Sequence, residues 1–528
     1  MDTPDDLFRR LEQLNDIGAS LSSERNLERL LEKILLAAKT ITRADGGTLY
    51  RISEDRQRLE FAIVRNDSLG IAFGGASGQP LPDTFRDLPL YTPGGAANNS
   101  MVAAYATLHV RTVNIADAYD ADGFDFSGTR AFDARTGYRS RSFLTVPMKN
   151  HEGEVIAVLQ LINAMNGEGG QVGVFTAADQ RLAESLASQA AVALTNRQLV
   201  QQLETLFEAF IHLINIAIDE KSPYTGGHCQ RVPELTMMLA EAADQATEGP
   251  LKDFHLTDQD RYELKIAALL HDCGKVTTPV HVVDKATKLQ TLFDRIHLID
   301  TRFEVLRRDA EIAMLRAIQA GEDAREAEAR FAEQSRQLEA DRDFLRHANI
   351  GGERMSDEDI ARVGRIARQY RWKNPAGQEE PFLSANELEN LTIRAGTLTP
   401  AEREIINYHI VATIRMLEAL PWPKHLKRVP EYAGGHHERM DGKGYPKGLK
   451  REDMSWQARM MGIADIFEAL TAGDRPYKPA MKLSQALEIM RNFRDNGHID
   501  PDLYQVFLEA GVPQRYGRAF LQAGQVDV

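Results

Sequence analysis

The stretch that constrains the fold most strongly places a histidine and an aspartate at the end of a helix that is expected to be buried. The helix-forming apolar residues 267–270 are followed at once by His271 and Asp272, and then by Gly274 and Lys275. An imidazole and a carboxylate in this position can ligate a cation, and the two oxygens of a carboxylate can bridge two cations. Because a single His-Asp pair is more often a structural hydrogen bond, a metal site requires further ligands elsewhere in the chain.

Length and composition bound the class of protein. With 528 residues, the chain is too long for one ordinary core, so two or three domains are expected. Hydrophobic residues make up 43% and charged residues 27% of the chain. No apolar run approaches the roughly 18 residues that a membrane span needs. The N-terminus is charged from its second residue and lacks the apolar core of a signal peptide, so we expect a cytoplasmic protein without a membrane anchor.

Charge and cysteine content exclude further classes. The formal charge of −14 disfavours nucleic acid as a partner, because phosphates require a basic surface. An anionic substrate would need local positive charge, which metal ions and a few Lys or Arg residues can supply. The two cysteines, Cys229 and Cys273, cannot form a disulfide framework. We interpret both as small buried residues rather than metal ligands.

The first part of the chain predicts a helix followed by a mixed domain. Apolar residues recur at three- and four-residue steps from residue 4 to about 41, which predicts one helix. After Gly46 the pattern changes to that of strands, with a short helix at about 100–109. The expected strands are residues 48–52, 59–64, 142–148 and 155–162. This arrangement indicates an α+β sensor module.

A second helical pattern runs from about residue 179 to 219. Its second half carries apolar residues at alternating four- and three-residue steps, namely Leu199, Leu203, Leu206, Phe210 and Leu213. Such a heptad seam predicts a parallel dimeric stalk, and hence a homodimer. A connector helix buried against its own domains explains the pattern equally well.

Three motifs in the second half of the chain resemble one family. They are AIDEKSPYTGGHCQRV (217–232), AALLHDCGKVTTPVHVVDKATKL (267–289) and AGGHHERMDGKGYPKGL (433–449). Together they resemble the HD-GYP family of metal-dependent phosphodiesterases, a branch of the HD-domain phosphohydrolases whose usual substrate is cyclic di-GMP. The resemblance implies an all-α domain that contains a metal centre.

The family's ligand order can be followed through this sequence. It implies the metal ligands His228, His271, Asp272, His409, His436, His437 and Asp465. The resemblance makes Asp272 the bridge between two divalent ions and a catalytic residue. Imidazole-rich sites with carboxylates suit iron, manganese or zinc better than magnesium or calcium, so iron or manganese is expected. Some family members hold a third metal through a carboxylate at a position that is Tyr224 here, so two ions are expected.

The resemblance also implies residues that bind substrate. Lys275 corresponds to a phosphate-binding lysine and is expected to take part in catalysis, while Arg475 and Lys478 would add positive charge; a solvated surface pair is the alternative for these two. Tyr445 lies in a glycine-rich loop that is suited either to stacking a guanine or to docking a partner protein, such as a diguanylate cyclase with a GGDEF domain. The sequence leaves both alternatives open.

A second resemblance concerns residues 27 to 195. The runs VNIADAYDADGFDF, DARTGYRSRSFLTVPMKNHEGEVIAVLQLINA and FTAADQRLAESLASQAAVAL are similar to GAF domains, especially those of cyclic-nucleotide phosphodiesterases and cyclases. The nucleotide-binding branch carries an Asn-Lys, Phe, Asp-Glu signature. This chain has Asn163, Ala164, Phe175, Asp179 and Gln180 at those positions. Since the Lys and the Glu are absent, the small-molecule ligand of the domain stays unidentified, and the lack of cysteine removes the usual attachment point for a bilin.

One segment departs from the HD-GYP pattern. The match stops after Leu289 and resumes at LTPAEREIINYH, where Thr399, Pro400 and Glu402 predict a helix start with a capping box. Residues 290–397 are therefore an insertion, rich in Ala, Glu and Arg at helical spacing, with Gly321 as the expected bend of a helical hairpin. We interpret it as a projecting arm with an interaction role; a passive lid or spacer is the alternative.

These features predict an α+β multidomain protein with four parts. They are an N-terminal helix (1–26), a GAF sensor domain (27–195), a stalk helix (196–218) and an all-α HD-GYP domain (219–528). The expected activity is metal-dependent hydrolysis of cyclic di-GMP to pGpG under control of the GAF domain. The sequence leaves open whether the reaction stops at pGpG or continues to GMP. The alternatives are an HD phosphohydrolase acting on another cyclic dinucleotide or nucleotide, and a non-catalytic receptor or docking protein.

Overall fold

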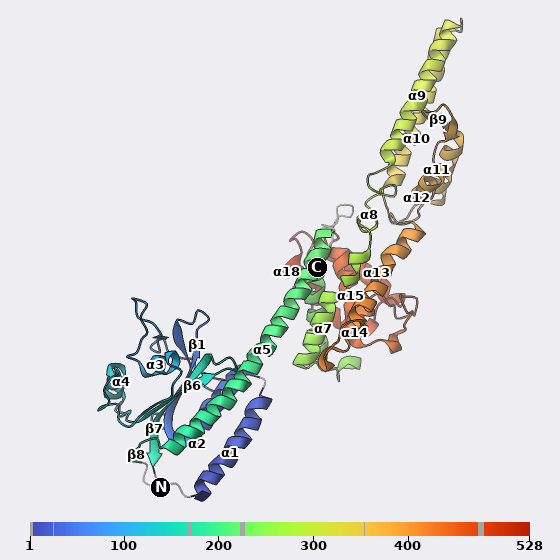
Figure 1. Ribbon diagram of the computed structural model, residues 1–528. Coiled ribbons are helices and arrows are strands. Elements are labelled where there is room, and N and C mark those ends of the chain that lie inside the picture. Colours follow the sequence, from blue (N-terminus) through green and yellow to red (C-terminus); the bar gives the residue numbers. More distant parts are fainter. Residues whose placement is uncertain (1–3, 25, 167–170, 222–226, 353, 474–479) are drawn as a thin grey trace. The chain divides into compact units, whose positions relative to one another are not determined.

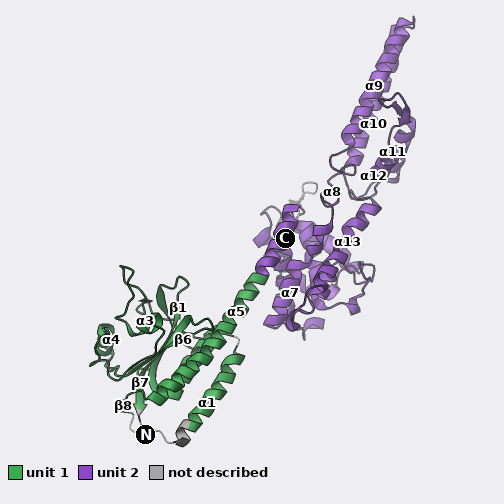
Figure 2. Cartoon of the chain, viewed as in Figure 1, with its two compact units in different colours: residues 1–207 green, residues 208–528 purple. Residues whose placement is uncertain are grey.

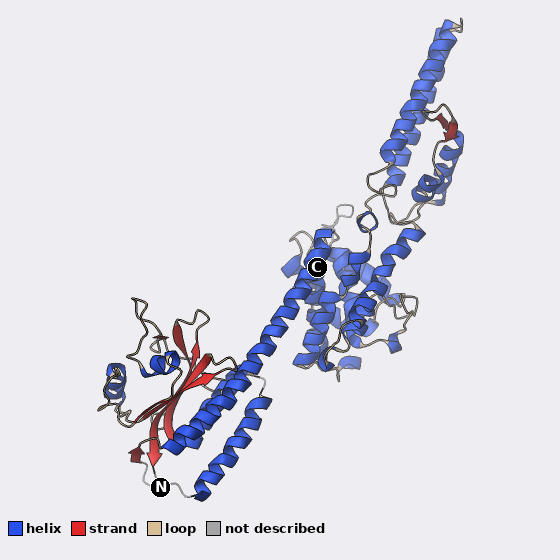
Figure 3. Ribbon diagram, viewed as in Figure 1, coloured by secondary structure: helices blue, strands red, loops and turns tan. Residues whose placement is uncertain are grey.

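The computed structural model describes residues 4–24, 26–166, 171–221, 227–352, 354–473 and 480–528 (Figure 1). The chain divides into two compact units, residues 1–207 and 208–528 (Figure 2). Each unit has its own architecture, which Figure 3 shows by secondary structure. Among the described residues, none of the helices is long and apolar enough to cross a membrane.

Unit 1 is built on an antiparallel sheet with the strand order β3-β2-β1-β7-β6-β5. These strands are β1 (Ala44–Ile52), β2 (Arg58–Asn66), β3 (Ile71–Phe73), β5 (Val113–Ile115), β6 (Phe143–Lys149) and β7 (Val155–Asn166). Two short strands extend it, since β4 (Leu88–Pro89) pairs with β2 and β8 (Gln171–Gly173) with β7. The four strands predicted from the sequence are confirmed as the central four of this sheet.

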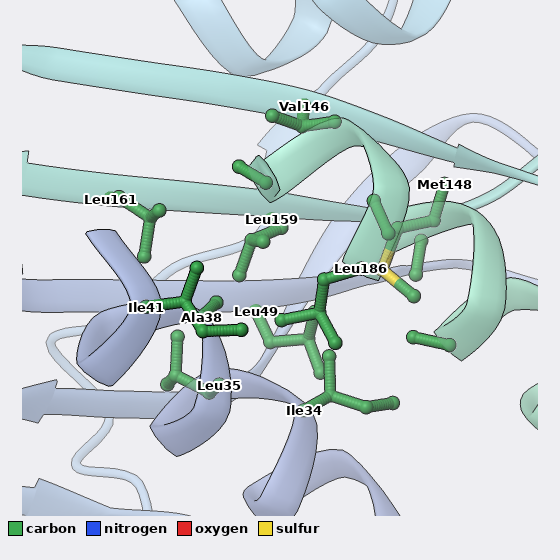
Figure 4. Close-up of a cluster of buried hydrophobic side chains, with 14 of the residues drawn as sticks. Ile34, Leu35, Ala38, Ile41, Leu49, Val146, Met148, Leu159, Leu161 and Leu186 are labelled. Atoms are coloured by element: carbon green, nitrogen blue, oxygen red, sulfur yellow. The ribbon is translucent and has the colours of Figure 1, made fainter. Parts of the chain in front are cut away.

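Helices cover both faces of the sheet. On one face, α2 (Leu27–Thr42) and the first part of α5 (Ala177–Lys221) pack apolar side chains onto β1, β6 and β7. Figure 4 shows Leu35, Leu49, Leu159 and Leu186 meeting in this core. On the other face, α3 (Val102–Leu108) packs on the sheet, and α4 (Ser127–Thr136) follows β5 along the chain. The α+β class predicted for this region is confirmed.

The N-terminal segment forms two helices, so the prediction of one helix was wrong. α1 (Pro4–Ser23) ends before α2 begins at Leu27. The break has a local cause, because Asn26 has extended backbone angles and its side chain accepts a hydrogen bond from the N–H of Arg29. Asparagine is a strong N-cap residue, and it starts a new helix here. The apolar pattern continues through the break because both helices contribute to the same core.

The core of unit 2 is helical. It consists of α6 (His228–Asp244), α7 (Asp258–Leu270), α13 (Pro400–Glu418), α14 (Val429–Gly434), α15 (Trp456–Thr471), α16 (Leu483–Asp495), α17 (Pro501–Glu509) and α18 (Val512–Phe520). The predicted start of α13 is confirmed. Thr399 accepts a hydrogen bond from the N–H of Glu402, whose side chain accepts one in return from the N–H of Thr399.

Between α8 (Val280–Val283) and α13 the chain forms a separate substructure. It contains α9 (Ile296–Gln319), α10 (Ala324–Asn349), α11 (Asp357–Gln369), β9 (Arg371–Lys373), β10 (Glu379–Pro381) and α12 (Ala385–Leu391). α9 and α10 form an antiparallel hairpin, and Gly321 lies in its turn with a φ of +96° that favours glycine. Phe303, Leu345 and Phe382 belong to a hydrophobic core of its own. The short β9–β10 pair was not anticipated from the sequence.

Candidate metal centre

Five helices of unit 2 bring the predicted ligands together at helix ends and on inward faces. His271 and Asp272 follow the last residue of α7, and His228 is the first residue of α6. His409 lies inside α13, the pair His436 and His437 follows α14, and Asp465 lies on α15. All seven side chains come from segments that are far apart in the sequence.

A glycine allows two of these segments to approach closely. A Cβ atom at Gly274 would lie 2.0 Å from the main-chain oxygen of His409 and 2.5 Å from the main-chain nitrogen of Thr413. The N–H of Gly274 instead donates a hydrogen bond of 2.9 Å to Oγ1 of Thr413. The glycine of the HDxGK stretch therefore lets the segment after Asp272 pack against α13, which carries His409.

His228, His271 and Asp272 form the first cluster. Their ligand atoms lie within 4.8 Å of one another. Nε2 of His228 is 3.2 Å from Oδ2 of Asp272, and Nε2 of His271 is also 3.2 Å from that oxygen. Oδ1 of Asp465 lies 3.2 Å from Nε2 of His228. Two imidazole nitrogens and two carboxylates therefore face one point.

His409, His436 and His437 form the second cluster, again with ligand atoms within 4.8 Å of one another. Nε2 of His437 is 3.1 Å from Nε2 of His409. Asp272 connects the clusters, because its Oδ1 lies 3.4 Å from Nε2 of His409 while its Oδ2 faces the first cluster. A carboxylate in this position is suited to bridge two cations.

Two buried atoms support a metal centre. Among the described residues, Oδ1 of Asp272 and Nε2 of His436 are buried without a hydrogen-bond partner. Leaving such groups unpaired is costly, and a bound cation would satisfy both. Nδ1 of His436 is 2.7 Å from the carbonyl of Ala433 and so donates to it, which directs the lone pair of Nε2 into the site. The residues present therefore fit a pair of divalent ions.

Electrostatics keep these donors in the forms that bind metals. Burial lowers the pKa of His436 to about 4 and that of His437 well below its usual value, so both imidazoles are neutral at pH 7. Burial raises the pKa of Asp272, but the charges of Lys275 and His271 outweigh it and hold that pKa well below its ordinary value. Neutral imidazoles and ionised carboxylates are the species that ligate cations.

The structure describes two of the predicted substrate-binding residues, Lys275 and Tyr445, and both lie at the candidate site. Lys275 is partly buried, and its Nζ lies 2.5 Å from Oδ2 of Asp272, so its charge is directed at the centre of the site. Tyr445 lies beside His437, with ring centroids 4.8 Å apart and nearly parallel planes. Arg475 and Lys478 lie outside the described residues, as does Tyr224.

Hydrogen bonds attach the loop that carries Tyr445 to the residue that follows the candidate ligands His436 and His437. Glu438 follows His437, and its carboxylate accepts hydrogen bonds from the N–H groups of Lys447 (2.7 Å) and Leu449 (2.9 Å). A Cβ atom at Gly444 would lie 2.5 Å from Cα of Glu438, so only glycine allows this return of the chain. One face of the Tyr445 ring therefore rests on the imidazole of His437.

Sequence reasoning missed one buried carboxylate. Glu468 on α15 is fully buried, and its Oε2 lies 2.5 Å from Nδ1 of His228. Its spacing from Asp465 was the available signal, because residues three apart share a helix face. The interpretation of both cysteines as buried residues is confirmed. Burial raises the pKa of Cys229 to about 12 and that of Cys273 to about 11, so both thiols are protonated.

Unit 1 contains a separate cavity of about 520 Å³ between the sheet and the helices α3 and α4. Aromatic side chains such as Phe61, Phe85 and Tyr138 line it, together with polar groups such as Gln160. The signature position Asp179 has a structural partner, since the guanidinium of Arg10 from α1 forms a buried ion pair with it. This ion pair connects the first helix of the chain to the start of α5.

Comparison with known proteins identifies the domain types. A GAF domain model matches residues 26–194, and two HD domain models match residues 225–368 and 385–503. The chain therefore contains a GAF domain followed by a helical HD region. Among solved structures, the GAF domain from Acinetobacter phosphoenolpyruvate-protein phosphotransferase is 16% identical and covers 36% of this chain and 96% of that one, with a TM-score of 0.24.

Curated relatives match over shorter stretches. The 3'3'-cGAMP-specific phosphodiesterase 3 of Vibrio cholerae is 39% identical over 119 residues, which are 22% of this chain and 24% of the relative. A cyclic di-GMP phosphodiesterase of Pseudomonas aeruginosa is 35% identical over 136 residues, which are 26% of this chain and 32% of the relative. The matched stretches thus span less than a third of each relative.

Proposed function

We propose that this chain is a cytoplasmic, metal-dependent phosphodiesterase that hydrolyses cyclic di-GMP to pGpG under control of its GAF domain. One observation carries the proposal: Asp272 presents its two oxygens to two separate histidine clusters. The names of the curated relatives support the reaction class, since they are phosphodiesterases of cyclic dinucleotides.

The donor set fits two ions of the iron, manganese or zinc type, because it combines imidazoles with carboxylates. Two bound ions would lower the pKa of a water molecule and neutralise the charge that develops on the attacked phosphate. Asp272 and the histidines would hold the two ions at the attacked phosphate. Lys275 would add a fixed positive charge beside the carboxylate of Asp272. Arg475 and Lys478 lie outside the described residues and are proposed to add positive charge for the anionic substrate, with a solvated surface pair as the alternative. The exposed face of Tyr445 would either stack a guanine or dock a diguanylate cyclase of the GGDEF type.

A second candidate substrate is 3'3'-cGAMP, because two of the curated relatives are named as phosphodiesterases specific for it. Both substrates contain the same type of phosphodiester ring and differ in one base. Residues that contact the bases, rather than the metal ligands, would therefore determine which of the two substrates is preferred.

Regulation would reach the metal centre through α5. In unit 2, the side chain of Asn215 donates a hydrogen bond of 3.0 Å to the carbonyl of Leu269, two residues before His271. Nζ of Lys221 donates to the carbonyls of Lys275 (3.3 Å) and Val276 (2.5 Å). The end of α5 thus holds the main chain on both sides of the His-Asp pair. A small molecule in the cavity of unit 1 is the proposed signal.

The test is metal analysis and product chromatography on anaerobically purified protein, with cyclic di-GMP and 3'3'-cGAMP as parallel substrates. We expect close to two ions per chain and formation of pGpG; the same chromatogram reports whether hydrolysis continues to GMP. Metal-loaded protein that hydrolyses neither compound would contradict the proposal and favour a receptor or docking role.

A further inference from the structure

A histidine that ligates a metal through Nε2 needs an acceptor at Nδ1, because that hydrogen bond fixes the tautomer and the ring orientation. Three of the candidate ligands find the acceptor three residues earlier in the chain. Nδ1 lies 2.7 Å from the carbonyl of residue 268 for His271, 2.5 Å from that of residue 406 for His409, and 2.7 Å from that of residue 433 for His436. These carbonyls belong to the helix that ends beside, or contains, each histidine.

His228 has a different position. α6 begins at His228, and Gly227 before it has a left-handed backbone conformation. The ring therefore does not follow a turn of its own helix, as the other three do. Its acceptor comes from another helix, since Oε2 of Glu468 on α15 lies 2.5 Å from Nδ1 of His228.

Glu468 is itself held in place. It is fully buried, and its other oxygen, Oε1, accepts hydrogen bonds from Nε (2.7 Å) and Nη2 (2.6 Å) of Arg231. The guanidinium of Arg231 also lies against Gly227, where a Cβ atom would be 2.4 Å from Nη1. Arg231 thus fixes the carboxylate and covers the residue that precedes the ligand.

We propose that Glu468 is a positioning residue that makes the two metal sites unequal. It holds Nε2 of His228 toward Asp272 and Asp465, each at 3.2 Å. Its negative charge at Nδ1 makes Nε2 of His228 a stronger metal ligand than the Nε2 of a histidine whose Nδ1–H is bonded to a neutral carbonyl. The ion in the first cluster depends on Glu468, whereas the ion held by His409, His436 and His437 does not. The inference rests on the proposed pair of metals, but not on the identity of the substrate.

The test uses the full-length protein loaded with manganese and dialysed against increasing concentrations of chelator. Glu468→Gln keeps the size of the side chain and an acceptor oxygen but removes the charge. We expect one of the two ions to leave at a chelator concentration about 10–100-fold lower than in the wild type, and the second ion to leave at the wild-type concentration. Glu468→Asp retains the charge on a shorter side chain. In this variant the weaker ion should leave at a chelator concentration between those for Glu468→Gln and the wild type.

Glu263→Gln is the matched control. Glu263 is another buried carboxylate of unit 2, and it accepts a hydrogen bond from the N–H of Arg428 (2.7 Å) away from the histidines. Its removal should leave both metal affinities unchanged. If both ions leave Glu468→Gln together, or at wild-type concentrations, the proposed inequality is wrong; if Glu468→Gln does not fold, the same criteria apply to Glu468→Asp. Hydrolysis of cyclic di-GMP is measured separately, so a metal-binding protein without activity would contradict the proposed function alone.

Discussion

Lys285, which precedes the insertion, pairs with Glu402 at the start of α13, the helix that carries His409. Nζ of Lys285 lies 2.9 Å from Oε1 and 2.7 Å from Oε2 of Glu402, and 2.7 Å from Oδ1 of Asn390 in α12. Glu402 also completes the capping box of α13. The segment before the insertion and the start of the helix with the candidate ligand His409 are therefore joined by one ion pair, in which Lys285 is buried and Glu402 is partly exposed.

Replacing this lysine should destabilise unit 2. Lys285→Met leaves the carboxylate of Glu402 without its cation, and we expect a loss of about 1–3 kcal/mol in the free energy of unfolding, since Glu402 retains some exposure and its capping bonds. Urea unfolding of the full-length protein measures it. Lys443→Met, at a mostly exposed lysine, serves as the control. A double variant with Glu402→Gln should recover part of the loss; a Lys285→Met protein as stable as the wild type would contradict the prediction.

Asp272→Asn tests the bridging carboxylate. An amide cannot offer two anionic oxygens to two clusters, so we expect metal content to fall below one ion per chain and hydrolysis to reach background. Elemental analysis together with product chromatography provides the measurement. Asp258→Asn, in the first turn of the helix that precedes Asp272, should retain both properties. Activity that persists in Asp272→Asn without bound metal would refute the metal-dependent mechanism.

Periodicity predicted much of the fold, and the resemblance to the HD-GYP family predicted the candidate site. Alternating apolar residues located the four central strands, because each strand has a face in the core. The family resemblance implied seven ligand side chains from five stretches of the sequence, and the fold does bring these side chains together. That these seven side chains bind metal ions is part of the proposed function.

Contacts between distant segments could not be predicted in this way. The pairs Glu468 with His228 and Arg10 with Asp179 join residues from separate helices, and neither leaves a periodic pattern. The break at Asn26 was missed because the apolar stripe continues across it, whereas the cap depends on one polar side chain. The β9–β10 pair consists of three-residue strands, which are too short to show alternation.

Lys275→Ala should reduce catalysis without releasing metal. The ammonium lies 2.5 Å from Asp272 but is not a metal donor while protonated, and burial lowers its pKa less than Asp272 and Asp465 raise it. We expect kcat/KM for cyclic di-GMP to fall about tenfold or more at unchanged metal content. Arg475→Ala is expected to behave in the same way. Unchanged kinetics in either variant would assign that residue to structure or to the surface.

The burial of Lys288 is expected to make the free energy of unfolding increase with pH. Lys288 precedes the insertion, but its buried side chain packs against it, with Nζ 3.3 Å from Sδ of Met355 and 3.3 Å from the carbonyl of Leu391. Burial lowers its pKa to about 8 from 10.5. Between these values the unfolded chain binds more protons than the folded one, so this residue makes stability rise with pH.

Lys288→Met should therefore be more stable than the wild type below pH 8, on the order of 1–3 kcal/mol, and the difference should shrink toward pH 10. Urea unfolding followed by tryptophan fluorescence reports on it, since Trp372 lies in the same insertion. Lys373→Met, at an exposed lysine of β9, should show no such dependence. A variant that is less stable at pH 7 would show that the lost hydrogen bonds outweigh the cost of burying the charge.

The apolar seam of α5 predicts self-association. Leu199, Leu203, Leu206, Phe210 and Leu213 are exposed, with relative accessibilities between 46% and 65%, so these residues lack the cover that a buried connector helix would provide. A second copy of the same helix, parallel and in register, would bury this seam. We therefore expect a dimer for the wild type in sedimentation experiments. A GAF ligand that favours one packing of the stalk by a few kcal/mol would shift the activity of the metal centre.

Charges within the seam should separate the two functions of the helix. Leu203→Asp combined with Phe210→Asp places like charges at the interface, so we expect a monomer that retains both metals but no longer responds to occupancy of the GAF cavity. Gln201→Asp with His212→Asp adds the same charges at exposed positions on the opposite face of α5 and should leave the dimer intact. Sedimentation and hydrolysis assays are run on all three proteins. A monomeric wild type, or a seam variant that stays dimeric, would show that α5 is only a connector between the units.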